Sequence, residues 1–387
     1  MAIVYLSLLA GVKLHPQSKL QTLYYGYFEP ASMRLSQIPE NRPETRYRSP
    51  RARILLAPME GVVDFQMREL LTRIGSFDRC VTEFIRVTDA LLPARVFQRY
   101  CPELEQHSRT RSGTEVYLQL LGGDPVMMAA NARRAAALGS AGIDVNFGCP
   151  AKTVNRRDGG SILLQQPARV KAIVQAVRDA VPQNVPVSVK IRLGVDDTSQ
   201  LAEICSGIQQ AGADELCIHA RTRQDGYQPP AFWSHIKPLH ALLSMPVIVN
   251  GEIWNTQDAD QARLESQCSD LMLGRGALAC PDLSRQIRAH ATGQEYTPLE
   301  WPDILELVQQ SFNSMVSVRR RHTGNRLKQW LVYLKRQYPE ADALFQSLKP
   351  LRDVHAINSA IERHRAGLNI NCRSLDLIRP IQKTVSI

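Results

Sequence analysis

A cysteine lies in a tight turn directly after an apolar segment of this chain. The segment Gly142-Ile143-Asp144-Val145 has the length of a short buried strand, and it runs into Asn146-Phe147-Gly148-Cys149-Pro150. Gly148 and Pro150 flank the thiol and favour a tight turn. The carboxyl ends of parallel strands are where α/β proteins carry their chemistry. Cys149 is therefore a candidate nucleophile, metal ligand or proton donor.

Other polar side chains also lie in or directly after apolar segments. Gln119 has an amide that can both donate to and accept from the edge of a heterocycle. Lys190 and Arg192 share one apolar segment, where a buried lysine is costly without an anionic partner. His219 ends another segment. A further one runs into Pro58, Met59 and Glu60, which offer backbone groups and an apolar face to a flat ring.

Two glycine turns close the last apolar segments, Asn250-Gly251-Glu252 and Gly274-Arg275-Gly276. Glycine turns after the last two strands of a barrel commonly bind phosphate, and Arg275 could pair with it bidentately. Each glycine taken alone is more simply an ordinary turn residue. Together with Lys190 and Gln119, the two turns favour a cofactor that carries a phosphate.

A phosphate site beside a lysine and a glutamine around a flat pocket describes FMN, with Lys190 near the pyrimidine edge of the flavin. Cys149 is then best interpreted as a general acid, because an unperturbed thiol has a pKa of about 8.5. Cys205 and Cys217 have apolar neighbours and are predicted to be inert core thiols. None of the eight cysteines forms a C-x-x-C pair, so a zinc or iron–sulfur site has little support.

The polar, basic loop Lys152–Ser161 follows the cysteine turn. It could clamp a phosphodiester backbone, or it could be a solvated loop of a barrel. The residues favour neither interpretation over the other.

These candidates need a frame of alternating strands and helices. Eight β-like segments are predicted, at Arg53–Ala57, Cys80–Glu83, Glu115–Leu121, Gly142–Asn146, Pro186–Leu193, Glu215–Ala220, Met245–Asn250 and Asp270–Gly274. Helix-like segments lie between most of them, for example Pro125–Leu138, Pro167–Ala180 and Gln200–Ala211. This pattern predicts an α/β fold, a (β/α)8 TIM barrel, with a doubly wound sheet as the alternative.

The barrel is predicted to span residues 51–300, with a hinge at Pro298–Pro302 and a smaller all-helical domain at 301–365. Its clearest helices are Asp303–Val318 and Asn325–Gln337. Residues 1–50 show no sustained period and are expected to be a flexible extension or an upstream start-site artefact, and 366–387 a loosely attached tail.

The chain has 387 residues and a net charge of +10, and the excess of positive charge lies outside the nearly neutral barrel segment. Basic ends on a neutral body suggest a nucleic acid partner, although solvated surface charge would explain the same pattern. No apolar segment reaches the length of a membrane span, no secretory signal is evident, and scattered thiols fit a reducing compartment. We expect a cytoplasmic monomer with no metal and no membrane partner.

Six motifs occur in an order that resembles the tRNA-dihydrouridine synthases. They are Ala57–Gly61 (APMEG), Asn146–Pro150 (NFGCP), Lys190–Gly194 (KIRLG), His219–Thr222 (HART), Asn250–Glu252 (NGE) and Gly274–Gly276 (GRG). Longer stretches are similar to the bacterial C-type branch, the tRNA-dihydrouridine(16) synthases: Leu55–Val62, Thr82–Val87, Ala90–Pro93, Asn250–Trp254 and Lys328–Leu331. The resemblance runs from about Arg51 to about Arg363.

This resemblance implies an FMN-dependent reduction, driven by NADPH, of a uridine in the D-loop of tRNA, most simply at position 16. It implies that the flavin gives a hydride to carbon-6 of the uracil and that Cys149 gives a proton to carbon-5. The target base would have to be flipped out of the folded tRNA.

The resemblance also assigns residues. FMN would be held by Pro58, Met59, Glu60, Gln119, Lys190, His219, Asn250, Gly251, Glu252, Gly274 and Arg275. Arg86, Asn146 and Arg192 would contact the uridine and its neighbours. Arg319-Arg320-Arg321, Arg326 and Lys328 would hold the tRNA elbow through phosphates, unless they form a plain solvated helix face. Trp330 is more simply a core anchor than a base-stacking residue.

Two other functions remain open from the sequence. The barrel could be an FMN enzyme acting on a free pyrimidine, which would need no basic helical domain. It could also be an RNA-binding protein that has lost catalysis, against which the intact set of Cys149, Lys190 and His219 argues.

Overall fold

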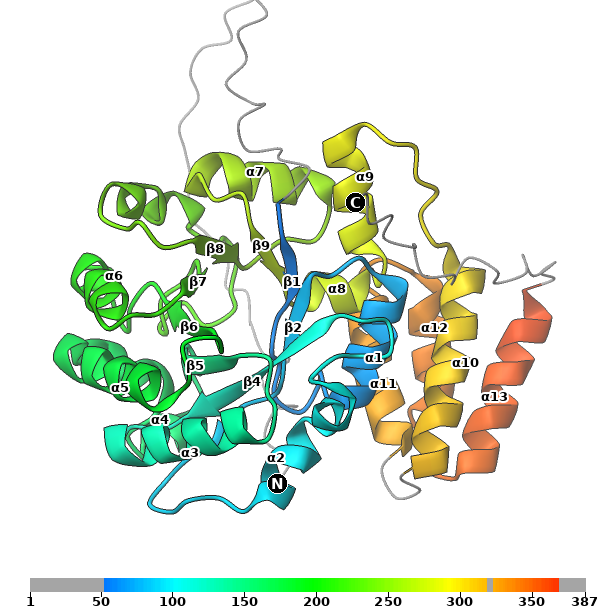
Figure 1. Cartoon of the computed structure of the whole chain (residues 1–387). Helices are drawn as coiled ribbons and strands as arrows, with labels where there is room; N and C mark the ends of the chain where they lie inside the picture. Colours follow the sequence, from blue (N-terminus) through cyan, green and yellow to red (C-terminus); the bar gives the residue numbers. More distant parts are fainter. Residues whose placement is uncertain (1–51, 319–322, 369–387) are drawn as a thin grey trace, which may run out of the picture. The chain divides into compact units, whose positions relative to one another are not determined.

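The computed structural model describes residues 52–318 and 323–368, in which parallel strands are wrapped by helices (Figure 1). The strands are β1 (Ile54–Leu56), β2 (Arg79–Val81), β3 (Ile85–Arg86), β4 (Glu115–Leu121), β5 (Ile143–Phe147), β6 (Val187–Arg192), β7 (Glu215–His219), β8 (Val247–Asn250) and β9 (Leu271–Leu273). They pair in the order β2-β1-β9-β8-β7-β6-β5-β4-β3, and a β2–β4 pairing closes the sheet. The predicted (β/α)8 barrel is confirmed, and the doubly wound alternative is wrong.

The second barrel strand differs from the prediction. The expected strand Cys80–Glu83 ends instead at Val81, and β3 follows as a separate piece along the same edge of β4. The interruption begins at Thr82, whose side-chain Oγ1 accepts the backbone N–H of Gln119 at 3.0 Å. A hydroxyl takes the place of a backbone carbonyl there, so the regular ladder stops for three residues. β2 and β3 together fill one of the eight positions of the barrel.

Helices cover the outside of the barrel. They are α1 (Phe65–Ile74), α2 (Ala94–Tyr100), α3 (Pro125–Ala137), α4 (Lys152–Asn155), α5 (Pro167–Ala180), α6 (Leu201–Gln210), α7 (Thr256–Ser266), α8 (Arg275–Ala279) and α9 (Leu283–Thr292). Local signals set several of their starts: the carboxylates of Asp64 and Asp124 cap α1 and α3, and prolines begin α3 and α5. The predicted helices over α3, α5 and α6 are confirmed to within one residue.

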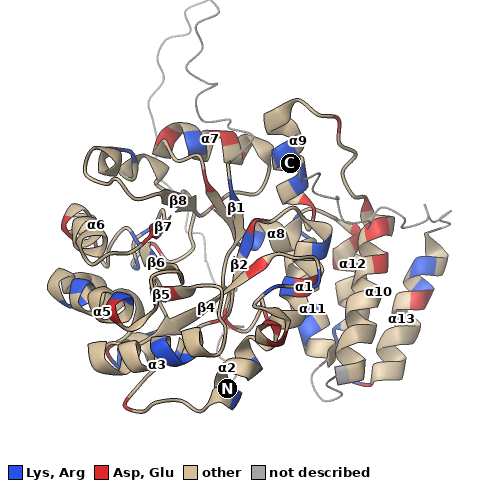
Figure 2. Ribbon diagram, in the orientation of Figure 1, with Lys and Arg blue, Asp and Glu red and all other residues tan. Residues whose placement is uncertain are grey.

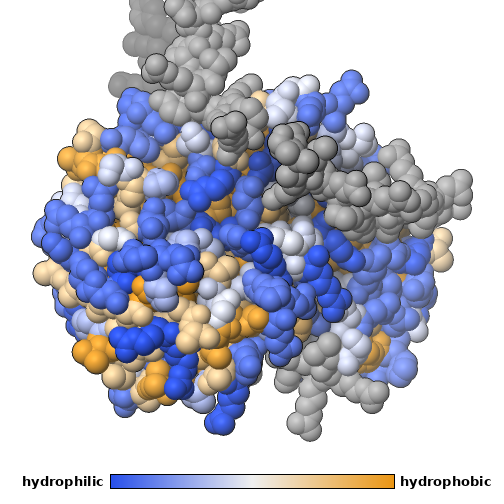
Figure 3. Space-filling model, in the orientation of Figure 1, coloured by the Kyte–Doolittle hydropathy of each residue, from blue (hydrophilic) through white to orange (hydrophobic). Residues whose placement is uncertain are grey.

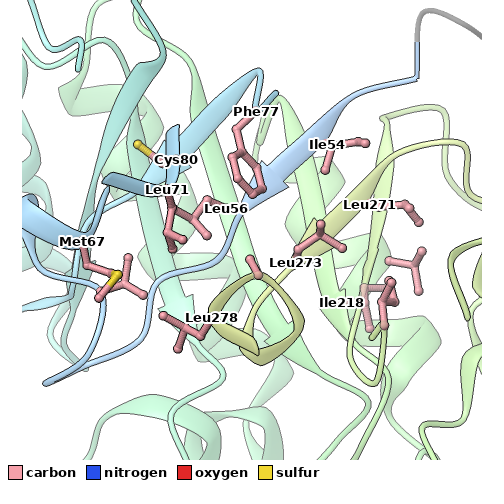
Figure 4. Close-up of a cluster of buried hydrophobic side chains, with 14 of the residues drawn as sticks. Ile54, Leu56, Met67, Leu71, Phe77, Cys80, Ile218, Leu271, Leu273 and Leu278 are labelled. Carbon is pink, nitrogen blue, oxygen red and sulfur yellow. The ribbon is translucent and has the colours of Figure 1, made fainter. Parts of the chain in front are cut away.

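Strand residues alternate between two apolar layers. Ile54, Leu56, Leu271 and Leu273 belong to the outer layer, in one apolar cluster with Met67 and Leu71 of α1 and Leu278 of α8. Figure 4 shows Leu56 next to Leu71, with Ile54 and Leu271 farther from α1. Leu55, Cys217, Ile248 and Met272 form a separate cluster inside the barrel. At the amino ends of the strands, Arg79 stacks on Tyr117 and pairs with Glu215, closing the barrel below this cluster. Polar residues farther along the strands are thereby held at the opposite, carboxyl end.

Four helices follow the barrel: α10 (Trp301–Val318), α11 (Thr323–Leu334), α12 (Glu340–Leu348) and α13 (Val354–Gly367). The expected hinge at Pro298–Pro302 is shorter than predicted, because Trp301 and Pro302 form the first turn of α10. Proline fits there since a first-turn N–H has no partner within the helix. The buried Trp330 of α11 donates to the carbonyl of Leu278 at 3.1 Å, which confirms it as a core anchor.

Charges of both signs lie on the outer helices, for example on α5 and α13 in Figure 2. The face shown in Figure 3 is mostly hydrophilic, with hydrophobic residues in small separate groups. Among the described residues, none of the helices is both long and apolar enough to cross a membrane. The expectations for residues 1–50, for Arg319–Arg321 and for nearly all of the predicted tail lie outside the described residues. Helix α13 itself extends two residues beyond the predicted boundary at 365.

Candidate active site at the carboxyl ends of the strands

The polar candidates from five strands meet at one end of the barrel. The strand register places Gln119 beside Asp144, Asn146 beside Lys190, and His219 beside both Arg192 and Asn250. All of these side chains are buried although each carries polar atoms. Because parallel strands end at the same rim, residues that are far apart in the sequence become neighbours.

The Cys149 turn is held by backbone and side-chain hydrogen bonds. Asn146 Oδ1 accepts the N–H groups of Gly148 at 2.8 Å and Cys149 at 3.1 Å. The carbonyl of Cys149 accepts from Asn155 Nδ2 and Ser161 Oγ, both at 2.9 Å, and from the backbone N–H of Ser161 at 3.0 Å. The polar loop Lys152–Ser161 therefore anchors this turn. Its basic residues, Lys152, Arg156 and Arg157, are by contrast exposed.

The thiol of Cys149 is half-buried and its neighbourhood keeps it protonated. It packs near Phe84, Leu121 and Val154, and burial raises its pKa above the ordinary value of a thiol, against a smaller lowering by the N–H of Ala151. A protonated thiol is a poor nucleophile and a poor metal ligand, whereas it can serve as an acid. Within residues 52–318 and 323–368, no cluster of three or more histidine, cysteine or acidic residues could hold a metal ion.

The other two cysteines singled out in the sequence are buried in apolar surroundings. Burial raises the pKa of Cys205 to about 12 and that of Cys217 to about 11. Both are core thiols that stay protonated, as predicted.

Lys190 presents an ammonium inside the mouth of the barrel. Its Nζ donates to Asn250 Oδ1 at 2.8 Å, and Asn250 is oriented by donating through Nδ2 to the carbonyl of Met272 at 2.7 Å. Burial lowers the pKa of Lys190, opposed by the nearby Cys217 and Asp144. An ammonium has three donors, so two remain for the acceptor atoms of a ligand ring.

His219 is a neutral imidazole at physiological pH. Burial lowers its pKa well below the usual range, and the positive charges of Arg192, Lys190, Arg221 and Arg275 lower it further. Its Nε2 faces an N–H of Arg221 at 3.4 Å and accepts there, which leaves the ring proton on Nδ1. The ring can therefore donate one hydrogen bond without adding charge to the site.

Two arginines share one carboxylate where β8 and β9 end. Glu252 accepts from Arg221, from Arg275 at 3.1 Å and from Trp254 Nε1 at 2.9 Å. Burial raises the pKa of Glu252, but these partners outweigh burial and lower it, so the side chain stays ionised. Two cations against one anion leave a net positive charge. A Cβ built on Gly274 would lie 3.8 Å from Ala57 Cβ and from Met59 Sδ, so this turn packs beside the turn that carries Met59.

Arg192 is almost fully buried and connects two loops, the one after β5 and the one after β7. It donates to the carbonyls of Gly148 at 2.9 Å, Thr222 at 2.9 Å and Gly226 at 2.8 Å. One of these loops carries Cys149. Arg86 lies nearer the surface, 3.5 Å from the carbonyl of Thr153.

The sequence has a clear family match. The family model described as "Dihydrouridine synthase (Dus)" matches residues 55–367. The chain belongs to the dihydrouridine synthase family, whose members are oxidoreductases.

Among similar proteins, the tRNA-dihydrouridine(16) synthase of Shewanella oneidensis is 48% identical over 318 residues, covering 82% of this chain and 99% of that protein. The enzyme of the same name from Escherichia coli K12 is 46% identical over 313 residues, covering 80% and 98%. A solved structure, "Crystal structure of TcOYE with pHBA", is 13% identical with a TM-score of 0.45, covering 62% of this chain and 89% of that chain.

In this dihydrouridine synthase, two of the basic side chains predicted to bind tRNA make contacts within the chain. Arg326 of α11 donates to the carbonyl of Gly61 and pairs with Asp64 at 2.9 Å, just beyond the turn that carries Met59. Lys328 donates to the carbonyl of Lys349 at 3.2 Å and to that of Leu351. Both side chains therefore have structural partners, whatever else they bind.

Several site residues were not predicted from the sequence. Asp144 and Ser188 lie two residues before Asn146 and Lys190, so strand alternation could have placed them inside the barrel. Tyr227 had no local signal: its exposed ring lies 5.0 Å from the Arg192 guanidinium and 5.2 Å from that of Arg275. It comes from a loop whose position depends on contacts far along the chain.

Gly251 is the glycine whose replacement should disturb this site most directly. It has φ +117°, and a Cβ there would lie 2.7 Å from Cδ2 of His219. Gly251→Ala should lower the free energy of unfolding by about 1–3 kcal/mol more than Gly139→Ala, since Gly139 also has positive φ (+89°) but open space around it. Urea unfolding of both variants would check this, and equal losses would contradict the predicted collision.

Proposed function

We propose that this chain is an FMN- and NADPH-dependent tRNA-dihydrouridine synthase that reduces the uridine at position 16 of the D-loop. The observation that carries the proposal is the similarity to enzymes of that name over nearly their whole length. The arrangement of protonated Cys149, buried Lys190 and neutral His219 at one rim supports it.

The residues present fit FMN. Gln119, Lys190 and His219 would supply hydrogen bonds to the edge of the ring system, and Pro58, Met59 and Glu60 would border it. Arg275 and the backbone of Gly251 and Gly274 would hold the phosphate beside Asn250. The carboxylate of Glu252 would orient the arginine. The excess positive charge of this cluster suits a phosphate group. When bound and reduced by NADPH, FMN would supply the hydride for carbon-6 of the uracil.

Cys149 is assigned the complementary proton transfer. Its Sγ–H bond breaks as the proton passes to carbon-5 of the uracil, which completes the 5,6-dihydro ring. The resulting thiolate takes a proton back from solvent, to which the half-buried side chain has access. Asn146 and Arg192 keep the turn in place during this step, and Arg86 lies near enough to the rim to meet a neighbouring nucleotide.

The proposal is tested by incubating unmodified tRNA with the protein and NADPH and mapping dihydrouridine by mass spectrometry. Dihydrouridine at position 16 alone is expected. Dihydrouridine at other D-loop positions would keep the reaction and overturn the position. If tRNA gives no product and free uridine is reduced instead, the proposal is wrong and the protein acts on small pyrimidines.

The helical domain is proposed to hold the tRNA body through its phosphates. Lys328→Glu should weaken tRNA binding. The fall of the logarithm of the binding constant with the logarithm of salt concentration should become shallower by about 1. The rate of NADPH oxidation should be unchanged. Lys171→Glu on α5 makes the same charge change on an exposed outer helix and should leave both quantities unaltered. If the two variants bind tRNA with equal affinity, Lys328 does not hold tRNA and serves only as a partner of the Lys349 and Leu351 carbonyls.

A further inference from the structure

A carboxylate is buried inside the barrel beneath the rim. Asp144 of β5 is 1% exposed, and both of its oxygens accept hydrogen bonds at 2.6 Å, Oδ1 from Ser188 Oγ and Oδ2 from Gln119 Nε2. The mechanism above makes no use of this group. Burying a carboxylate is costly, so what it stabilises needs explanation.

The hydrogen bonds continue from Asp144 to the Cys149 turn. Gln119 Oε1 accepts from Asn146 Nδ2 at 2.8 Å, and Asn146 Oδ1 accepts from the backbone N–H groups of Gly148 and Cys149. We call Asp144, Gln119 and Asn146 the buried relay. It connects the interior of the barrel to the backbone of the proposed proton donor across two strands.

The two ends of the buried relay determine the direction of every bond in it. An ionised carboxylate only accepts, so the NH2 group of Gln119 must face Asp144 and its oxygen must face Asn146. Backbone N–H groups only donate, so the oxygen of Asn146 must face the turn. Both requirements are met by the same pair of amide orientations, and no donor in the relay faces another donor.

We propose that Asp144 is a positioning residue that holds the Cys149 turn through Gln119 and Asn146. This inference rests on the proposed role of Cys149. Without an acceptor at position 144, the NH2 group of Gln119 loses its partner within the chain. The amide can then rotate, and Asn146 loses the bond that orients it. The turn then opens and the half-buried thiol becomes more accessible. Although burial raises the pKa of Asp144 to about 6, the carboxylate is ionised at pH 8, as the relay requires.

The test measures the reactivity of the Cys149 thiol in the full-length protein. Wild type, Asp144→Ala, Asp144→Asn and Ser188→Ala would be alkylated with iodoacetamide at pH 8, and the rate at Cys149 would be read from its own peptide by mass spectrometry. Asp144→Ala should react at least about threefold faster than wild type. Asp144→Asn should react like wild type, because its amide oxygen can face Gln119 while its NH2 faces Ser188.

Ser188→Ala is the matched control, since it removes a hydrogen bond from the same carboxylate but lies outside the buried relay. Its Cys149 rate should equal that of wild type. If Asp144→Ala does not fold, Gln119→Met interrupts the relay at the next residue and should give the same increase. An unchanged rate in folded Asp144→Ala, an equal rise in Ser188→Ala, or a rise in Asp144→Asn would each overturn the proposal.

This readout needs no substrate reduction, so the two proposals fail separately. A wild-type protein that makes no dihydrouridine would overturn the proposed function and leave the reactivity difference measurable. If the enzyme is active but the alkylation rate of Cys149 does not depend on Asp144, only the positioning role is overturned.

Discussion

Replacing Cys149 by alanine should slow the reduction of tRNA by about 10²–10⁴-fold, the usual contribution of a positioned general acid. Binding of FMN and of tRNA should persist, because the bonds that hold the turn come from the backbone of residue 149 and not from its thiol. Stopped-flow kinetics would separate the two half-reactions. Reduction of the enzyme by NADPH should keep its rate, and reoxidation by tRNA should carry the whole loss.

The pH dependence of the wild-type enzyme supplies a second check on Cys149. The thiol must be protonated to act, and burial raises its pKa above the ordinary value of a thiol. Reoxidation by tRNA should therefore be constant around neutral pH and fall only at alkaline pH, above the ordinary pKa of a thiol. Cys205→Ala removes a buried thiol from α6 and should leave the rate unaltered. If Cys149→Ala kept full activity, Cys149 would not be the proton donor.

Asp144→Asn should make the protein more stable at neutral pH. Burial raises the pKa of Asp144 from 3.8 to about 6, so the folded state disfavours the charged form. That shift corresponds to about 3 kcal/mol, which the uncharged amide would recover as an increase in the free energy of unfolding. A stabilising substitution inside a barrel would show that the carboxylate is retained at a cost to stability.

The sign of this effect fixes its pH window. Between pH 6 and 3.8 the folded wild type takes up a proton that the unfolded chain does not yet bind, so wild type gains stability as the pH falls. The advantage of Asp144→Asn should therefore be full above about pH 7 and disappear near pH 4. Urea unfolding at both values would measure it.

Asp197→Asn makes the same chemical change at an exposed site. Hydrogen bonds from the side chain and backbone of Ser199 lower the pKa of Asp197, so its replacement should give no gain at pH 7. If Asp144→Asn were less stable than wild type at pH 7, the charge at position 144 would itself stabilise the fold, and the interpretation of its raised pKa would be wrong.

Much of the fold could be predicted because its signals are local. Apolar segments of strand length, proline at helix starts and glycine turns placed all eight predicted strands to within one or two residues, although β3 was not predicted as a separate piece. The second strand was predicted less well, because its break depends on Thr82 bonding to Gln119, a residue 37 positions away. Such an interruption has no signature in the residues around it.

The candidate site was predictable in part for the same reason. Each of these residues lies at or within two residues of the carboxyl end of its strand: Gln119, Asn146, Lys190, His219 and Asn250. Parallel strands bring these ends to one rim once the barrel closes. Their convergence follows from the fold class. Their roles toward FMN and uridine remain proposals.

The sequence by itself determined the barrel, the rim and the residue types available there, because alternation and turn chemistry act over a few residues. Only the tertiary structure decided which partners those residues have. Protonation of Cys149, neutrality of His219 and the buried relay from Asp144 depend on burial and on charges from several strands. Arg326 and Lys328 likewise face carbonyls that chain folding brings to them. Hydrogen-bond direction and desolvation are properties of the assembled environment, which no single segment contains.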